Sequence, residues 1–174
     1  YANRKIPMIL ALAYSDNIYA LKTNMFLGDK QFITTLNKVG INDVENNVSL
    51  PLGTSEVNII NLTSAYQVLG NEGKMTNNYL IREIKSKDNK ILYKHQKNEK
   101  QILNNNYVYI ISELLRNCYD YQLVDYNSPT CLSIRPKITK KYAIKTGSTN
   151  TDSLIVGYNK DYTLGIWTEI GRAS

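Results

Sequence analysis

Histidine and cysteine are scarce in this chain of 174 residues, which contains one His and two Cys. With His95 alone, the chain offers neither a zinc site nor a Cys–His dyad, so we expect no metal and no other cofactor. Cys118 and Cys131 permit a single disulfide. The simpler interpretation is that both are small packing residues, and the sequence leaves this choice open.

Long apolar runs are also lacking. The longest nearly apolar stretch, residues 6–14, is interrupted by Pro7, and a membrane span needs about 20 such residues. A composition that is 43% hydrophobic suits one domain with a sizeable core. The net charge of +6 comes without a nucleic-acid-binding motif, so we expect no nucleic-acid partner. Much of the basic excess surrounds a predicted hairpin, at Lys85, Lys87, Lys90, Lys94, Lys97 and Lys100.

Apolar spacing in the first part of the chain predicts helices. Ser15-Asp16-Asn17 interrupts them, because short polar side chains bond the nearby backbone and favour caps and turns. Asp29, Asn104 and either Ser55 or Asn58 are the expected N-caps. The expected helices cover residues 6–13, 18–27, 30–39, 59–69 and 105–118.

The pattern then changes to the spacing of strands. Two short strands, 80–85 and 90–94, are expected around Asp88-Asn89, followed by a polar connector over 95–101. Three terminal strands are expected at 142–146, 153–158 and 162–168. Helices followed by a short antiparallel sheet indicate an α+β fold. The helical stripe expected to pack on the terminal sheet consists of Val108, Ile111, Leu114 and Leu115.

Lys145-Thr146-Gly147-Ser148-Thr149 closes one predicted strand and opens a hairpin. Thr146 and Ser148 are two residues apart, so both hydroxyls point to one side and can grip one carboxylate. Gly147 leaves room for another backbone, and Lys145 adds a positive charge. The group suits a ligand that ends in a free carboxylate and lies along the strand as an added strand. A hairpin turn with an exposed lysine is the simpler alternative for so short a motif.

Ser15-Asp16-Asn17 admits two interpretations as well. It is either a helix-breaking turn or a site in which the Ser15 hydroxyl passes a proton to a leaving nitrogen. In the second case the Asn17 amide bonds a substrate amide, while Asp16 shapes the turn. The two triplets make chemical sense only as one pocket, so we expect the Lys145 ammonium to lie beside the Ser15 hydroxyl.

Together with their flanks, these triplets resemble the C-terminal part of the transpeptidase domain of class A penicillin-binding proteins. The resemblance implies the α+β fold of penicillin-binding proteins and serine β-lactamases, in incomplete form, with residues 1–174 as the C-terminal part of the domain. The resembling segments are residues 11–20, 52–57, 64–66, 71–73, 145–149, 151–153, 156–158 and 165–167.

The resemblance implies that the parent protein is a serine-type D,D-transpeptidase outside the cytoplasmic membrane. Such enzymes cross-link peptidoglycan stem peptides through an acyl-serine, which β-lactam antibiotics also form. Ser15, Asn17 and Lys145 would be the catalytic residues. The substrate carboxylate would be held by the strand residues, and one backbone N–H there would form half of an oxyanion hole. The implied substrate-binding residues are Thr146, Gly147, Ser148 and Thr149.

The third mark of this family is a Ser-x-x-Lys pair that carries the nucleophile, and residues 1–14 contain no serine. We therefore expect the nucleophile and the membrane anchor to lie in an N-terminal part of the same protein outside this chain. That part would be a partner of the chain, and the chain alone would be inactive.

Two other functions remain open at this stage. One is a β-lactamase or a β-lactam sensor domain, although the sequence shows no base for deacylation. The other is a non-catalytic module that binds wall peptides or a partner protein.

Overall fold

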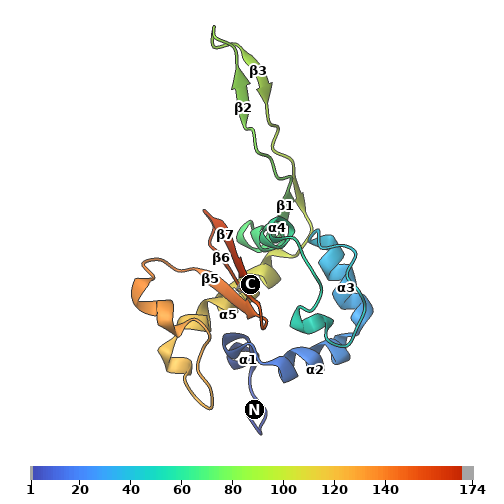
Figure 1. Ribbon diagram of the computed structural model, residues 1–174, viewed down its shortest axis with the longest axis vertical. Coiled ribbons are helices and arrows are strands. Elements are labelled where there is room, and N and C mark those ends of the chain that lie inside the picture. The colour runs from blue at the N-terminus through green and yellow to red at the C-terminus, as the bar shows by residue number, and fades with distance from the viewer. Residues whose placement is uncertain (1, 170–174) are drawn as a thin grey trace, which may run out of the picture.

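The computed structural model describes residues 2–169, and Figure 1 shows the arrangement of their elements. The α-helices are α1 (Met8–Tyr14), α2 (Asn17–Leu27), α3 (Asp29–Lys38), α4 (Ile59–Gly70) and α5 (Asn105–Leu115). The strands are β1 (Lys74–Thr76), β2 (Glu83–Lys85), β3 (Ile91–Lys94), β4 (Glu99–Gln101), β5 (Ala143–Ser148), β6 (Asp152–Tyr158) and β7 (Thr163–Glu169). Short 3-10 helices span Leu50–Leu52, Arg116–Tyr119, Tyr121–Leu123 and Leu132–Lys137.

A three-stranded antiparallel sheet, in the order β5-β6-β7, forms the centre of the body. Helix α4 contacts β6 and β7, and α5 contacts β5. Leu115 of α5 is buried together with Ala143 of β5 and Tyr158 of β6. The α+β class predicted from the sequence is therefore confirmed. None of the helices in the described part of the chain is both long and apolar enough to cross a membrane.

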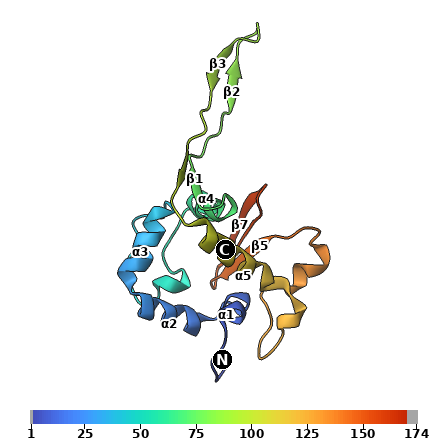
Figure 2. The ribbon, with the colours of Figure 1, turned by 180° about the vertical axis from the view of Figure 1, so that it is seen from behind.

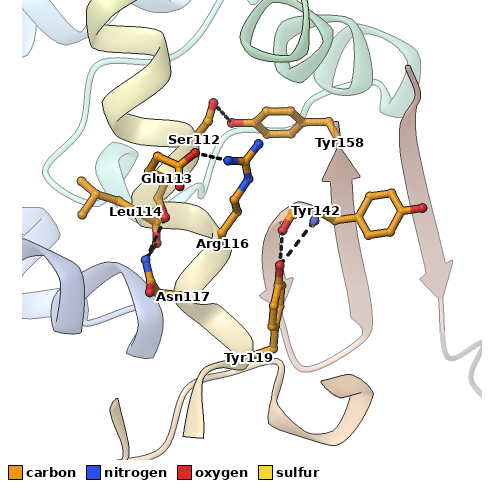
Figure 3. Close-up of polar contacts among 8 residues, drawn as sticks. All are labelled: Ser112, Glu113, Leu114, Arg116, Asn117, Tyr119, Tyr142 and Tyr158. Atoms are coloured by element: carbon orange, nitrogen blue, oxygen red, sulfur yellow. Dashed lines mark hydrogen bonds and ion pairs between the residues drawn. The ribbon is translucent and has the colours of Figure 1, made fainter. Parts of the chain in front are cut away.

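Hydrogen bonds join α5, and the 3-10 helix Arg116–Tyr119 that follows it in the chain, to the sheet (Figure 3). The hydroxyls of Ser112 and Tyr158 are 2.9 Å apart and both groups are largely buried. The Tyr119 hydroxyl donates to the Tyr142 carbonyl oxygen at 2.9 Å and accepts from the Tyr142 N–H at 3.3 Å. Because buried polar groups are costly when unpaired, these pairs fix α5 against the end of β6 and the 3-10 helix against the residue before β5.

The sequence located most helix ends correctly because side chains cap them. Asn58 accepts the Ile60 N–H at 2.8 Å, and Asn104 accepts the Asn106 N–H at 2.9 Å. Asp29 is not the expected N-cap of α3: that position is Gly28, with φ +87°, and Asp29 lies in the first turn. The Asp29 carboxylate instead accepts the Asn24 side-chain amide at 2.6 Å.

One expected core residue is misplaced. Val108 and Leu115 are buried as predicted, and Ile111 packs on the sheet cluster. Leu114 is only half-buried, and in Figure 3 its side chain points away from the strands. The stripe of α5 that packs on the sheet is therefore narrower than the sequence suggested.

Strands β2 and β3 form a hairpin that projects far from the body, as Figures 1 and 2 show from opposite sides. It joins the body through a second two-stranded sheet, in which β1 pairs with β4 and Lys74 is opposite Gln101. The prediction of a connector over residues 95–101 was therefore wrong for residues 99–101, whereas residues 95–98 have no regular secondary structure. All three residues of β4 are exposed, so the strand lacks the apolar alternation by which a strand is detected.

Candidate active site

Ser15 lies at the turn between α1 and α2. Its backbone adopts the left-handed conformation, with φ 53° and ψ 49°, which is uncommon for a residue other than glycine and costs free energy. The Asp16 N–H donates to the Ala11 carbonyl oxygen at 2.9 Å, and the Asp16 carboxylate caps α2 by accepting the Tyr19 N–H at 2.8 Å. The turn is therefore fixed from both sides, with Ser15 at its apex.

A second segment, far away in the sequence, holds this turn. The Tyr126 hydroxyl donates to the other oxygen of the Asp16 carboxylate at 3.1 Å. The Tyr126 ring meets the Tyr14 ring edge-on, with 5.1 Å between centroids. The Thr130 N–H donates to the Ala13 carbonyl oxygen at 2.9 Å. Burial and the adjacent Asp16 carboxylate raise the pKa of Tyr126, so its phenol stays protonated and able to donate.

Tyr14 and Tyr126 were not among the site residues predicted from the sequence. The segment over residues 121–140 is irregular and has no periodic pattern, so nothing in the sequence indicated that it would fold back onto the α1–α2 turn. The available indication was chemical, because the hydroxyl of a tyrosine needs a hydrogen-bond partner when the ring is buried.

Lys145 approaches the turn from β5. Its ammonium nitrogen donates to the Ser15 hydroxyl oxygen and to the Thr146 carbonyl oxygen at 2.7 Å. The expectation that Lys145 and Ser15 lie side by side is therefore confirmed across 130 residues of sequence. Burial lowers the pKa of Lys145, whereas the nearby thiols of Cys131 and Cys118 favour its charged form.

Strand β5 is the edge strand of the sheet, and it pairs only with β6 among the described strands. The Thr149 N–H donates to the Asp152 carbonyl oxygen at 2.9 Å, and Gly147 is opposite Leu154 in the register. Because hydrogen-bonded pairs alternate along an antiparallel ladder, the backbone N–H groups of Thr146 and Ser148 face the open edge. These groups can bind an extended ligand.

The predicted site residues also include Asn17, Gly147 and Thr149. Asn17 is exposed in the first turn of α2. A Cβ added at Gly147 would meet no atom closer than 3.9 Å, so the glycine leaves open space beside the strand. The Thr149 hydroxyl is engaged in the turn, where it donates to the Asp152 carboxylate at 2.9 Å and accepts the Asp152 N–H at 2.9 Å.

The site is separate from a cavity of about 920 Å³ at the foot of the β2–β3 hairpin. Tyr79 and His95, stacked at 3.9 Å between centroids, line that cavity, whereas Ser15 and Lys145 do not. Among residues 2–169, no group of three or more His, Cys, Asp or Glu side chains is arranged to hold a metal ion.

The chain is similar to known proteins over its whole length. Residues 1–170 match the family model described as the penicillin binding protein transpeptidase domain. The chain is 35% identical over 175 residues to penicillin-binding protein 2D of Bacillus subtilis, covering 100% of this chain and 25% of that protein. It is 28% identical over 164 residues to penicillin-binding protein 1A of Aquifex aeolicus, covering 93% of this chain and 22% of that protein.

Solved structures share the fold. Penicillin-binding protein 1A of Haemophilus influenzae superposes with a TM-score of 0.86 at 17% identity, over 97% of this chain and 32% of that one. Penicillin-binding protein A of M. tuberculosis, as its imipenem acyl-enzyme complex, gives a TM-score of 0.79 at 11% identity, over 99% of this chain and 45% of that one.

The chain belongs to the penicillin-binding protein transpeptidase domain family. It spans about a quarter of the length of the curated relatives described above.

Proposed function

We propose that this chain supplies the Ser-Asp-Asn and Lys-Thr-Gly half of the active site of a peptidoglycan D,D-transpeptidase. The observation that carries the proposal is the hydrogen bond from the Lys145 ammonium to the Ser15 hydroxyl, between two motifs 130 residues apart. Residues 1–174 form the C-terminal part of the transpeptidase domain. The nucleophilic serine and its lysine come from an N-terminal part of the same protein, which also anchors the domain at the extracytoplasmic face of the membrane.

Lys145 and Ser15 divide the work of proton transfer and charge stabilisation. An ammonium has three donors, and two of them bond Ser15 and Thr146. The third remains for the terminal carboxylate of a stem peptide or for the carboxylate of a β-lactam. Because the Ser15 oxygen accepts from Lys145, the Ser15 proton is free to move to the nitrogen that leaves when the acyl-serine forms.

The open edge of β5 holds the substrate. A stem peptide laid along it pairs with the backbone of Thr146 and Ser148. The Ser148 N–H contributes one donor to the oxyanion hole, and the N–H of the nucleophilic serine contributes the other. Asn17, exposed at the start of α2, orients the substrate amide.

Labelling with a fluorescent penicillin tests the proposal. The chain alone stays unlabelled, because acylation requires a nucleophile activated by a neighbouring base. The intact protein forms a stable adduct on a serine outside this chain. Rapid turnover of the penicillin would instead indicate a β-lactamase, and the absence of an adduct on the intact protein would indicate a non-catalytic binding module. An adduct on a serine within this chain would overturn the assignment of Ser15 as a relay.

A further inference from the structure

The two cysteines of the chain meet behind the active-site strand. Cys118 lies in the 3-10 helix Arg116–Tyr119, and Cys131 immediately precedes the 3-10 helix Leu132–Lys137. Both side chains are buried and neither is in a disulfide. They form one apolar cluster with Ile144, the residue that precedes Lys145.

The backbone geometry suits a disulfide. The Cys131 N–H donates to the Cys118 carbonyl oxygen at 2.8 Å. A direct backbone hydrogen bond of this kind is compatible with the separation of about 4.4–6.8 Å that Cα atoms have across a disulfide. Each thiol shifts the pKa of the other, and both side chains belong to the same buried cluster, so they lie close together.

The pair adjoins the active site on two sides. Thr130, which precedes Cys131, donates its N–H to Ala13 of the Ser15 turn at 2.9 Å. The Lys145 ammonium is close enough to influence both thiols. Hydrogen bonds from Cys118 and Thr130, together with the Lys145 charge, lower the pKa of Cys131 to about 7. Cys118 stays protonated, because its contact with Cys131 and its burial raise the pKa of the Cys118 thiol.

We propose that Cys118 and Cys131 form a redox switch beneath Lys145, which closes to a disulfide when a disulfide oxidant reaches it and thereby slows acylation of the enzyme. The effect on acylation rests on the proposed function. Formation of the disulfide does not.

The closure is a thiol–disulfide exchange with a protein or small-molecule disulfide as the oxidant. The Cys131 thiolate attacks one sulfur of the oxidant, forming a mixed disulfide and releasing the first oxidant thiolate. The Cys118 sulfur, after giving its proton to that thiolate, attacks Cys131 and releases the second oxidant thiolate. The two cysteines are oxidised by two electrons, and the oxidant disulfide is reduced to two thiols. Because both cysteines are buried, the reaction requires local opening of the irregular segment that carries them.

Closure acts on Lys145 through charge. In the reduced pair, the Cys131 thiolate favours the ammonium form of the buried lysine. A disulfide carries no charge, so the thiolate no longer offsets the cost of burying the Lys145 ammonium. The charged form of Lys145 becomes less favourable, and its attraction for a substrate carboxylate weakens.

The experiment treats the intact protein with oxidised glutathione, alkylates it with iodoacetamide under denaturing conditions, and digests it with trypsin. No lysine or arginine lies between the two cysteines, so both occur in one peptide. That peptide covers residues 117–137, because trypsin cleaves after Arg116 and Lys137 but not at Arg135, which precedes Pro136. We expect this peptide to be two hydrogens lighter and unalkylated after oxidation, and doubly alkylated after dithiothreitol. A doubly alkylated peptide under both conditions would show that Cys118 and Cys131 do not form a disulfide.

The acylation rate with fluorescent penicillin is measured on the same samples. We expect it to fall about fivefold on oxidation, equivalent to a modest loss of transition-state stabilisation, and to recover with dithiothreitol. Cys118→Ser and Cys131→Ser are matched controls whose rates should not respond to the oxidant. An oxidised peptide with an unchanged rate would overturn the switch. Failure of acylation in both redox states would refute the proposed function, while the peptide masses still decide whether the disulfide forms.

Discussion

The β2–β3 hairpin and the sheet that carries Lys145 are both antiparallel, yet they are held in different ways. Ala143 and Val156 in the sheet are buried, and helices α4 and α5 cover one side of it. In the hairpin, Leu80 and Leu92 are exposed, and its register is held by its own ladder, with Ile84 opposite Tyr93. The strands of the sheet are therefore held in place by long-range packing, whereas those of the hairpin are held by pairing with each other.

Lysine side chains in the two regions differ in the same way. Lys85 and Glu83 are 2.8 Å apart on the exposed hairpin, where solvent screens the attraction and its contribution is small. Lys145, by contrast, is half-buried, and its contacts are with a hydroxyl and a carbonyl oxygen. Substitutions should therefore matter greatly in the body and little in the hairpin.

The largest expected effect is that of Lys145→Ala on acylation. The change removes the donor to Ser15 and the charge that awaits the substrate carboxylate, so the acylation rate of the intact protein should fall about 10²–10⁴-fold. The measurement is the second-order rate with fluorescent penicillin. Lys141→Ala, an exposed lysine just before β5, is the control and should label at the wild-type rate. Equal acylation rates for the two variants would show that Lys145 takes no part in acylation.

The next effect concerns the foot of the hairpin. Gly73 has φ +86° and receives the N–H groups of Ile102 and Leu103 at its carbonyl oxygen, at 3.0 and 3.1 Å. A Cβ added there would overlap the Leu103 carbonyl oxygen. Gly73→Ala should therefore lower the free energy of unfolding by about 2–4 kcal/mol, measured by denaturant melts of the intact protein.

Gly53→Ala is the matched control for that strain. Gly53 also has positive φ, in the left-handed helical region with φ 84° and ψ 34°, but an added Cβ there would meet no atom within 4 Å. Its cost should be about 1–2 kcal/mol, from the backbone conformation alone. If both variants lose the same stability, close packing at Gly73 is not what fixes the foot of the hairpin.

The sequence was informative where function and structure leave local signals. The caps at Asn58 and Asn104, and the turn at Ser15, follow from the preferences of single residues. The meeting of Ser15 with Lys145 was inferred because their chemistry requires it. The Tyr126 contact with Asp16 and the pairing of β1 with β4 depend on distant segments without periodic patterns, so single-sequence reasoning had no access to them.

A smaller effect is expected for Tyr126→Phe, which removes the donor to Asp16 while keeping the ring against Tyr14. Stability should fall by about 1 kcal/mol. Because Tyr126 acts through Asp16 on the Ser15 turn, the acylation rate should fall by about tenfold. Tyr121→Phe, at an exposed tyrosine of the same segment, should change neither quantity. A stability loss without a rate change would make Tyr126 purely structural.

The smallest expected effect is that of Leu92→Ser on the hairpin. Leu92 is 63% exposed, whereas Val156 in the sheet is 2% exposed. Truncating Val156 to Ala leaves a cavity and should cost about 1–3 kcal/mol, but replacing Leu92 should change the free energy of unfolding by less than about 0.5 kcal/mol. Both are read from denaturant melts of the intact protein. A loss at Leu92 comparable to that at Val156 would mean that another part of the protein covers the hairpin, because only a covered side chain contributes burial free energy.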